Sequence, residues 1–158
     1  MEKREDKGLR CYFLNCFYFG GVQAGIQAQH AATRLSRKYH KDTEEEFVVQ
    51  NVERQNKIEM INDWADNHET SIVLNAGMHG DLVLMEEFLE SKENIFPWAR
   101  FNESKYAANG CYTSIAIVLP DRIFDPKTEK TLAGTIYPEL SSWETEFYNK
   151  IKKMPLMR

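Results

Sequence analysis

A strand that passes through two glycines directly into a helix is the feature that most constrains this 158-residue chain. Residues 10–19 are apolar and aromatic on both faces, as expected for a central strand of a covered sheet. Gly20 and Gly21 follow, and an Ala- and Gln-rich helix is predicted over 22–39. In α/β proteins, ligands commonly bind where such a strand ends. The chain is therefore predicted to be an α/β protein with a site where this helix begins.

Two stripes of side chains run along the predicted helix at helical spacing. The polar stripe consists of Gln23, Gln27, His30 and Arg34. The apolar stripe consists of Ala24, Ala28, Ala31 and Leu35. We expect the small apolar stripe to pack closely against a sheet and the polar stripe to lie at the margin of a cleft. A solvated glutamine-rich face with a structural histidine is the alternative interpretation of the same pattern.

The rest of the chain predicts three more strands and several helices. The further strands are expected at 70–75, 96–101 and 112–119. The further helices are expected at 52–64, at 82–89 behind a capping Asp81, and after the capping box Ser141-Ser142-Trp143-Glu144. This order implies a mixed four-stranded sheet with helices on both faces, plus an appended C-terminal helix.

We expect a single domain, because a chain of this length supports one compact core. The predicted divisions are a mobile tail at 1–9, an α/β domain at 10–124 and a C-terminal extension at 125–158. Residues 42–46 are polar and predict an exposed connection. In the extension Trp143, Phe147 and Ile151 share one side of the predicted helix, so we expect them to dock on the sheet.

Composition excludes several classes of protein. No apolar run approaches the ~20 residues needed to cross a bilayer, and the charged N-terminal residues lack the apolar core of a signal peptide. We therefore expect a cytoplasmic protein with no membrane partner. Cys11, Cys16 and Cys111 have neither an even count nor the spacing of a zinc site. We expect free, mostly buried thiols, with no metal ion and no cofactor.

The charge balance limits nucleic-acid binding to a local patch. A net charge of −4 and a pI near 5.6 do not favour a strong, sequence-independent grip on phosphates. A basic group lies at the end of the first predicted helix, formed by Arg34, Arg37, Lys38, His40 and Lys41. It is the candidate for contact with tRNA or another nucleotide-containing ligand. The alternative is a solvated basic helix end, which the helix macrodipole favours.

The segment Val22–Ala31 resembles, without a gap, a motif of the peptidyl-tRNA hydrolase family typical of archaea and eukaryotes, which also occurs in bacteria. The family motif has the form Gly-Lys-x-Ala-Ala-Gln-x-x-His-Ala. Gln27 and His30 fall on its glutamine and histidine, whereas Gln23 stands in place of a lysine implicated in the family's catalytic site. The resemblance implies an α/β fold of the peptidyl-tRNA hydrolase type.

The loop before the last predicted strand extends the resemblance. In the family this loop carries an acidic residue and ends in a Gly-x-x-Thr-like segment. Gly110 and Thr113 form a segment of this kind here. Residues 102–113 are more similar still to the Glu-Pro-Asp…Asn…Leu-Thr-Ala loop of uncharacterised bacterial and bacteriophage relatives. Their first helix reads Gln-x-Gly-Ile-Gln-x-x-His-Ala. The loop of this chain matches the loop of these relatives at Glu103, Asn109 and Thr113, but it lacks their Pro-Asp pair.

The resemblance implies hydrolysis of the ester that joins a peptide to the tRNA ribose, or of a related substrate. The candidate catalytic residues are Gln23, Gln27, His30, Glu103, Asn109 and Thr113. The candidate RNA contacts are Arg34, Arg37, Lys38 and Lys41. The glutamines can donate to an oxyanion or hold a water, while His30 or Glu103 can accept a proton.

A non-catalytic relative is the alternative. It would use the same cleft to bind a nucleotide, an RNA end or a protein, for example as a phage-type inhibitor or accessory factor. The feature that separates the two hypotheses is Gln23, since the charge of a lysine is missing there. The sequence is compatible with a homodimer.

Overall fold

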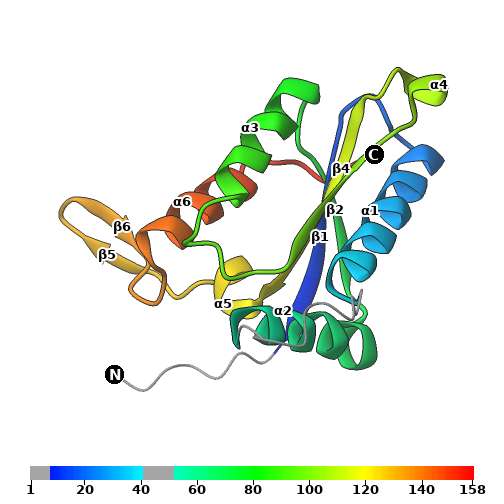
Figure 1. Cartoon of the computed structure of the whole chain (residues 1–158). Coiled ribbons are helices and arrows are strands. Elements are labelled where there is room, and N and C mark those ends of the chain that lie inside the picture. Colours follow the sequence, from blue (N-terminus) through cyan, green and yellow to red (C-terminus); the bar gives the residue numbers. More distant parts are fainter. Residues whose placement is uncertain (1–7, 41–51) are drawn as a thin grey trace.

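A mixed four-stranded sheet forms the centre of the molecule, with the strand order β2-β1-β4-β3 (Figure 1). The strands are β1 (Leu9–Asn15), β2 (Ser71–Asn75), β3 (Trp98–Asn102) and β4 (Tyr112–Pro120). β1 pairs in parallel with β2, whereas the β1–β4 and β3–β4 pairs are antiparallel. The predicted α/β class and the mixed four-stranded sheet are confirmed.

The computed structural model describes residues 8–40 and 52–158. β1 begins at Leu9. Residues 1–7 of the predicted tail, Lys41 and the predicted connection at 42–46 lie outside the described residues.

Helices cover both faces of the sheet, as predicted (Figure 1). The main helices are α1 (Val22–His40), α2 (Val52–Asp63) with the π-helical turn Trp64–His68, α3 (His79–Leu89) and α6 (Ser142–Ile151). Phe13 of β1 packs with Leu35 of α1 in one core cluster. The next residue, Leu14, packs with Phe147 of α6 in the other, because successive strand residues point to opposite faces.

The alanine stripe of α1 lies against the sheet, as predicted. Ala24, Ala28, Ala31 and Leu35 are all buried. Small side chains allow the helix axis to approach the strands closely, which brings the neighbouring polar stripe to the sheet as well. α3 begins after Met78, and Asp81 in its first turn accepts the Met78 N–H at 2.8 Å. Asp81 therefore caps α3 as a residue of its first turn, and not as the residue that precedes the helix.

Some elements differ from the prediction. β1 ends at Asn15 rather than Phe19, because the chain turns where the Phe19 N–H donates to the Cys16 carbonyl oxygen. The loop before β4 contains a short helix that was not predicted, α4 (Lys105–Ala108). The other unpredicted elements are α5 (Asp121–Phe124) and the hairpin β5 (Glu129–Thr131) and β6 (Gly134–Ile136).

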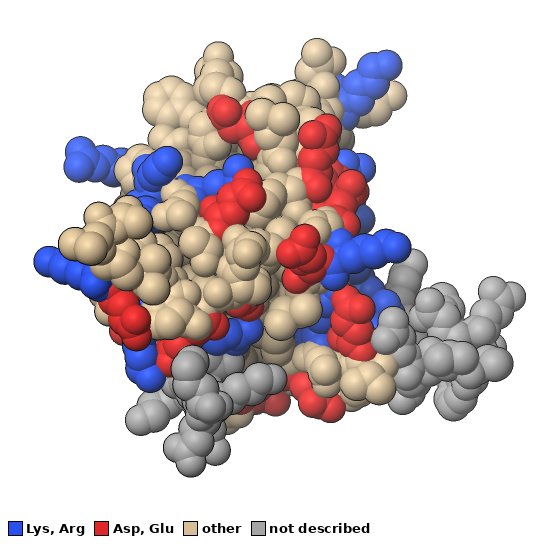
Figure 2. All heavy atoms as spheres, turned by 90° about the vertical axis from the view of Figure 1, so that its left-hand side faces the viewer, with Lys and Arg blue, Asp and Glu red and all other residues tan. Residues whose placement is uncertain are grey.

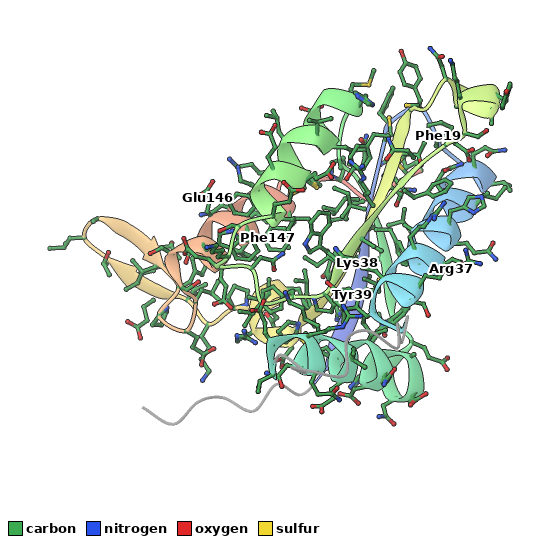
Figure 3. The ribbon with its side chains drawn as sticks, viewed as in Figure 1. Phe19, Arg37, Lys38, Tyr39, Glu146 and Phe147 are labelled. Carbon is green, nitrogen blue, oxygen red and sulfur yellow. The ribbon has the colours of Figure 1, made fainter. Side chains whose placement is uncertain are left out.

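The C-terminal helix docks on the sheet as predicted. In its capping box the Glu144 N–H donates to Ser141 Oγ at 3.1 Å, and the Ser141 N–H donates to Glu144 Oε2 at 2.9 Å. Trp143, Phe147 and Ile151 are buried in the core, and Figure 3 shows Phe147 on the side of α6 that faces the sheet. The extension therefore belongs to the same core as the α/β domain.

The end of the described chain lies along the outer edge of β2. The Asn75 N–H donates to the Pro155 carbonyl oxygen at 2.8 Å, and the Met157 N–H donates to that of Val73 at 2.9 Å. The Gly21 N–H then donates to the carbonyl oxygen of Arg158 at 3.2 Å. This segment consequently reaches the turn that precedes α1.

Among residues 8–40 and 52–158, no helix is both long enough and apolar enough to span a membrane. The same residues contain no group of three His, Cys, Asp or Glu side chains placed to hold a metal ion. Cys11 and Cys16 are free and fully buried, and they belong to the clusters on opposite faces of the sheet.

Candidate functional site

A buried asparagine fixes the junction at which α1 begins. Asn15, at the end of β1, is 0% exposed. Its Nδ2 donates to the Ala24 carbonyl oxygen at 2.9 Å, and its Oδ1 accepts from Ser114 Oγ at 2.7 Å. These bonds join β1, α1 and β4 at one point. Asn15 was not among the predicted site residues, although a lone asparagine in an apolar strand is a recognisable signal for a buried polar contact.

Gln27 of α1 and Glu103, which follows β3, form the polar centre of the site. Gln27 Nε2 donates to Glu103 Oε1 at 3.1 Å, across 76 residues of sequence. Glu103 Oε2 accepts the N–H of Ser104 at 3.2 Å, so both carboxylate oxygens have partners. The carboxylate is thereby held in one orientation. The structure brings these two predicted site residues into direct contact.

The other end of the Gln27 amide is a buried acceptor. Gln27 is only 2% exposed, and its Oε1 has no hydrogen-bond partner among the described residues. A buried polar atom left in this state costs about 1–3 kcal/mol. Protein interiors rarely contain such atoms, and those that persist require a reason, of which a functional site is one.

His30 and Thr113 both contact Phe101 of β3. The His30 imidazole stacks on the Phe101 ring with centroids 4.6 Å apart. Thr113 is fully buried, and its Oγ1 donates to the Phe101 carbonyl oxygen at 3.3 Å. His30 is exposed beside the Gln27–Glu103 pair, whereas the Thr113 hydroxyl is committed to the sheet. Phe101, which connects the two, was not predicted as a site residue.

Gln23 and Asn109 are both exposed to solvent. Gln23 lies in the first turn of α1, one helical turn before Gln27. Asn109 ends the short helix α4 in a left-handed conformation with φ 54°, and Gly110 follows with φ 72°. Asparagine and glycine tolerate this conformation better than other residues. The left-handed turn at Asn109 is therefore sufficient to explain why an asparagine occupies this position.

The polar stripe of α1 continues along the outer edge of β3. The Arg34 guanidinium carbon lies 5.9 Å from the centre of the Phe101 ring. Lys38 Nζ donates to the Trp98 carbonyl oxygen at 2.8 Å and lies 4.2 Å from the centre of a Trp98 ring. Burial, reinforced by the positive charge of Lys57, lowers the pKa of Lys38. The stripe therefore follows the edge of the sheet at β3.

A groove of about 870 Å³ lies beside β3, between α1 and α3. Its lining residues are Arg34, Arg37, Lys38, Glu86, Glu90, Trp98, Ala99 and Arg100. Figure 3 shows Lys38 and Tyr39 on the side of α1 toward the sheet, and Arg37 on its outer side. Three of the four predicted RNA contacts thus line one groove, and the fourth, Lys41, is outside the described residues.

Comparison with known proteins assigns neither a family nor a function to this site. Neither the models of protein families nor the curated proteins contain a match to this chain.

Proposed function

We propose that the protein hydrolyses an ester bond at the Gln27–Glu103 pair, with peptidyl-tRNA or a related ester as the substrate. The observation that carries the proposal is the 3.1 Å bond between Gln27 Nε2 and Glu103 Oε1, together with the unpaired buried oxygen of the same amide. A held carboxylate next to an unsatisfied polar atom suits the binding of a water molecule and a polar substrate.

In the proposed reaction Glu103 is the general base. Its carboxylate accepts a proton from a water molecule while the water oxygen attacks the ester carbonyl carbon. Gln27 acts as a positioning residue, since its amide donates to the carboxylate and orients it. The carbon–oxygen bond to the ribose then breaks, and the ribose oxygen takes up the proton. The products are a free carboxylic acid and the ribose alcohol.

The beginning of α1 supplies donors for the developing negative charge. Gln23 is exposed in the first helical turn, and its amide can donate a hydrogen bond to an oxyanion. The positive end of the helix macrodipole favours an anion at the same place. His30 lies one turn beyond Gln27 on the same stripe, where it can contact the leaving group.

Binding without turnover is the second candidate function, and the exposed Gln23 favours it. A glutamine brings no charge to the first turn of α1, so an anionic ligand would be held there by hydrogen bonds alone. In this case the same cleft binds a nucleotide, an RNA end or a protein.

Single-turnover kinetics separate the two functions. An N-acetylated aminoacyl-tRNA, labelled in the acyl group, is incubated with a large excess of the purified protein, and release of the label is followed. A first-order release faster than spontaneous hydrolysis supports the esterase. If the labelled tRNA is retained on a filter by the protein but is not cleaved, the binding function is supported in its place.

A further inference from the structure

The groove beside β3 has the open edge of the sheet as its floor. β3 is the last strand in the order β2-β1-β4-β3, so its outer side has no neighbouring strand in the described structure. Figure 1 shows this edge between α1 and α3. Trp98, Ala99 and Arg100 line the floor, and the two helices form the walls. A groove with a strand edge as its floor is shaped to receive another extended chain.

The pairing of β3 with β4 defines which backbone groups face the groove. The Val118 N–H donates to the Pro97 carbonyl oxygen, so Pro97 faces β4. Alternation along an antiparallel strand then points the N–H and C=O groups of Trp98 and Arg100 outward. Consistent with this, the Trp98 carbonyl oxygen accepts from Lys38 Nζ at 2.8 Å. The Trp98 N–H donates to Tyr39 Oη at 3.4 Å. Lys38 and Tyr39 of α1 thus occupy both outward backbone groups of Trp98, and the open stretch begins at Arg100.

The two walls of the groove carry opposite charges. Arg34, Arg37 and Lys38 form the α1 wall, and Glu86 and Glu90 belong to the α3 wall. Arg100 Nη1 contacts both carboxylate oxygens of Glu86, at 2.8 and 2.9 Å, which neutralises part of the acidic wall. In Figure 2, acidic atoms lie beside basic ones along the right-hand part of the face. The unmatched charge in the groove is therefore positive and lies on α1.

We propose that the groove binds an extended acidic peptide as an added strand on β3. Side chains directly opposite each other on neighbouring strands share one face of the sheet. Peptide residues opposite Ala99 and Phe101 consequently face α1, and those opposite Trp98 and Arg100 face α3. Acidic side chains at alternate positions meet Arg34, Arg37 and Lys38, while the intervening side chains rest against Trp98. This interaction goes beyond the proposed function, because it holds whether or not Glu103 hydrolyses an ester.

Two other occupants fit these observations less well. A phosphate backbone would be repelled by Glu90 on the α3 wall, and it has no N–H groups that could pair with the strand edge. A second copy of the chain, paired through its own β3 about a two-fold axis, would set the α1 walls side by side. Arg34 and Arg37 of one copy would then approach the same residues of the other, and like charges disfavour that arrangement.

The test is fluorescence anisotropy with labelled, N-acetylated peptides of about six residues, the usual length of a strand. The main peptide alternates Glu and Val. One control groups the glutamates in one half, and another replaces them with Lys. Two further peptides are N-methylated, one at the Glu nitrogens and the other at the Val nitrogens. In an added strand only one of these sets donates to β3, so methylation of one set alone should abolish binding.

The charge-reversal variant Arg34→Glu/Arg37→Glu should weaken binding of the alternating peptide by about tenfold or more. Lys153→Glu, at an exposed lysine on the segment after α6, is the matched control and should leave binding unchanged. Circular dichroism checks the fold of each variant, and the single variant Arg34→Glu replaces the pair if the double variant unfolds.

Several outcomes would overturn the proposal. They are no binding of the alternating peptide, equal binding of both N-methylated peptides, and equal binding of the peptide with grouped glutamates. Displacement of the peptide by a short oligoadenylate at lower concentration would assign the groove to RNA. If the protein sediments as a dimer, and the charge reversals make that dimer more stable, the groove would be assigned to a second copy of the chain.

Discussion

Gln27 and Glu103 meet at 3.1 Å although 76 residues separate them, and this bond ties the first helix to the loop that follows the edge strand. The helix reaches the loop because its alanine stripe lets it approach the sheet. The same contact buries the glutamine almost completely.

Asn15→Ala should destabilise the protein by about 1–3 kcal/mol, because it leaves the Ala24 carbonyl oxygen and the Ser114 hydroxyl without their partner. Urea denaturation measures the change in the free energy of unfolding. Gln29→Ala, at an exposed position of α1, is the control, and its effect should stay within about 0.5 kcal/mol. Equal stability of Asn15→Ala and the wild type would show that these two bonds do not hold the junction.

Phe147→Ala should cost about 3–5 kcal/mol, since this side chain is fully buried between α6 and the sheet. The large loss is expected because the C-terminal helix shares the core of the α/β domain. Leu132→Ala, in the exposed hairpin, should change stability by less than about 0.5 kcal/mol. A small effect at Phe147, measured by the same urea titration, would mean that the helix is dispensable to the core.

Tyr112 should make the stability sensitive to alkaline pH. Burial and the negative charge of Glu86 raise the pKa of its phenol, so the folded protein keeps a proton that the unfolded chain releases. The corresponding stability is fully present below pH about 10, the ordinary pKa of tyrosine, and is lost as the pH rises above it.

Tyr112→Phe should therefore flatten the fall in stability at alkaline pH. Because the buried Tyr112 hydroxyl has no hydrogen-bond partner among the described residues, the variant should differ from the wild type by less than about 1 kcal/mol at pH 7. Thermal unfolding across a pH series gives both results. Tyr106→Phe, at a fully exposed tyrosine, should leave the profile unchanged, and an unchanged profile for Tyr112→Phe would refute the assignment.

Gln23→Lys should be tolerated and should raise the rate of ester hydrolysis. The side chain is exposed in the first turn of α1, where a flexible ammonium can reach an anionic substrate. A cation near a helix N-terminus costs about 0.3–1 kcal/mol, so the melting temperature should fall slightly. Gln29→Lys adds the same charge outside the polar stripe and should not change the rate. A large destabilisation by Gln23→Lys would contradict its exposed position.

The parts of the fold that were predicted correctly depend on local signals. The capping box Ser141–Glu144 lies within one helical turn, and the two stripes of α1 follow from helical spacing alone. The four strands were recognised as apolar runs, and the bounds of β2 and β4 were predicted within one residue. The end of β1 and the start of β3 were not. β1 ends at Asn15, whose partners Ala24 and Ser114 come from other elements, so no local pattern marks that boundary.

The site was predictable only as a set of residues. Spacing placed Gln27 and His30 on one stripe, but the contact of Gln27 with Glu103 depends on the strand order of the sheet. The stacking of His30 on Phe101 and the contact of Lys38 with the Trp98 carbonyl oxygen depend on β3 being the edge strand. Pairings of this kind are set by tertiary structure, which a single sequence does not display.

The most direct test of the proposed function is the hydrolysis rate of N-acetylated aminoacyl-tRNA by Glu103→Gln. This substitution preserves an oxygen that can accept the Gln27 hydrogen bond but removes the ability to take up a proton. The wild type should hydrolyse the ester, and Glu103→Gln should be slower by about 100-fold or more. Glu129→Gln, in the exposed hairpin, should retain the wild-type rate. Equal rates for Glu103→Gln and the wild type would contradict the assignment of Glu103 as the general base.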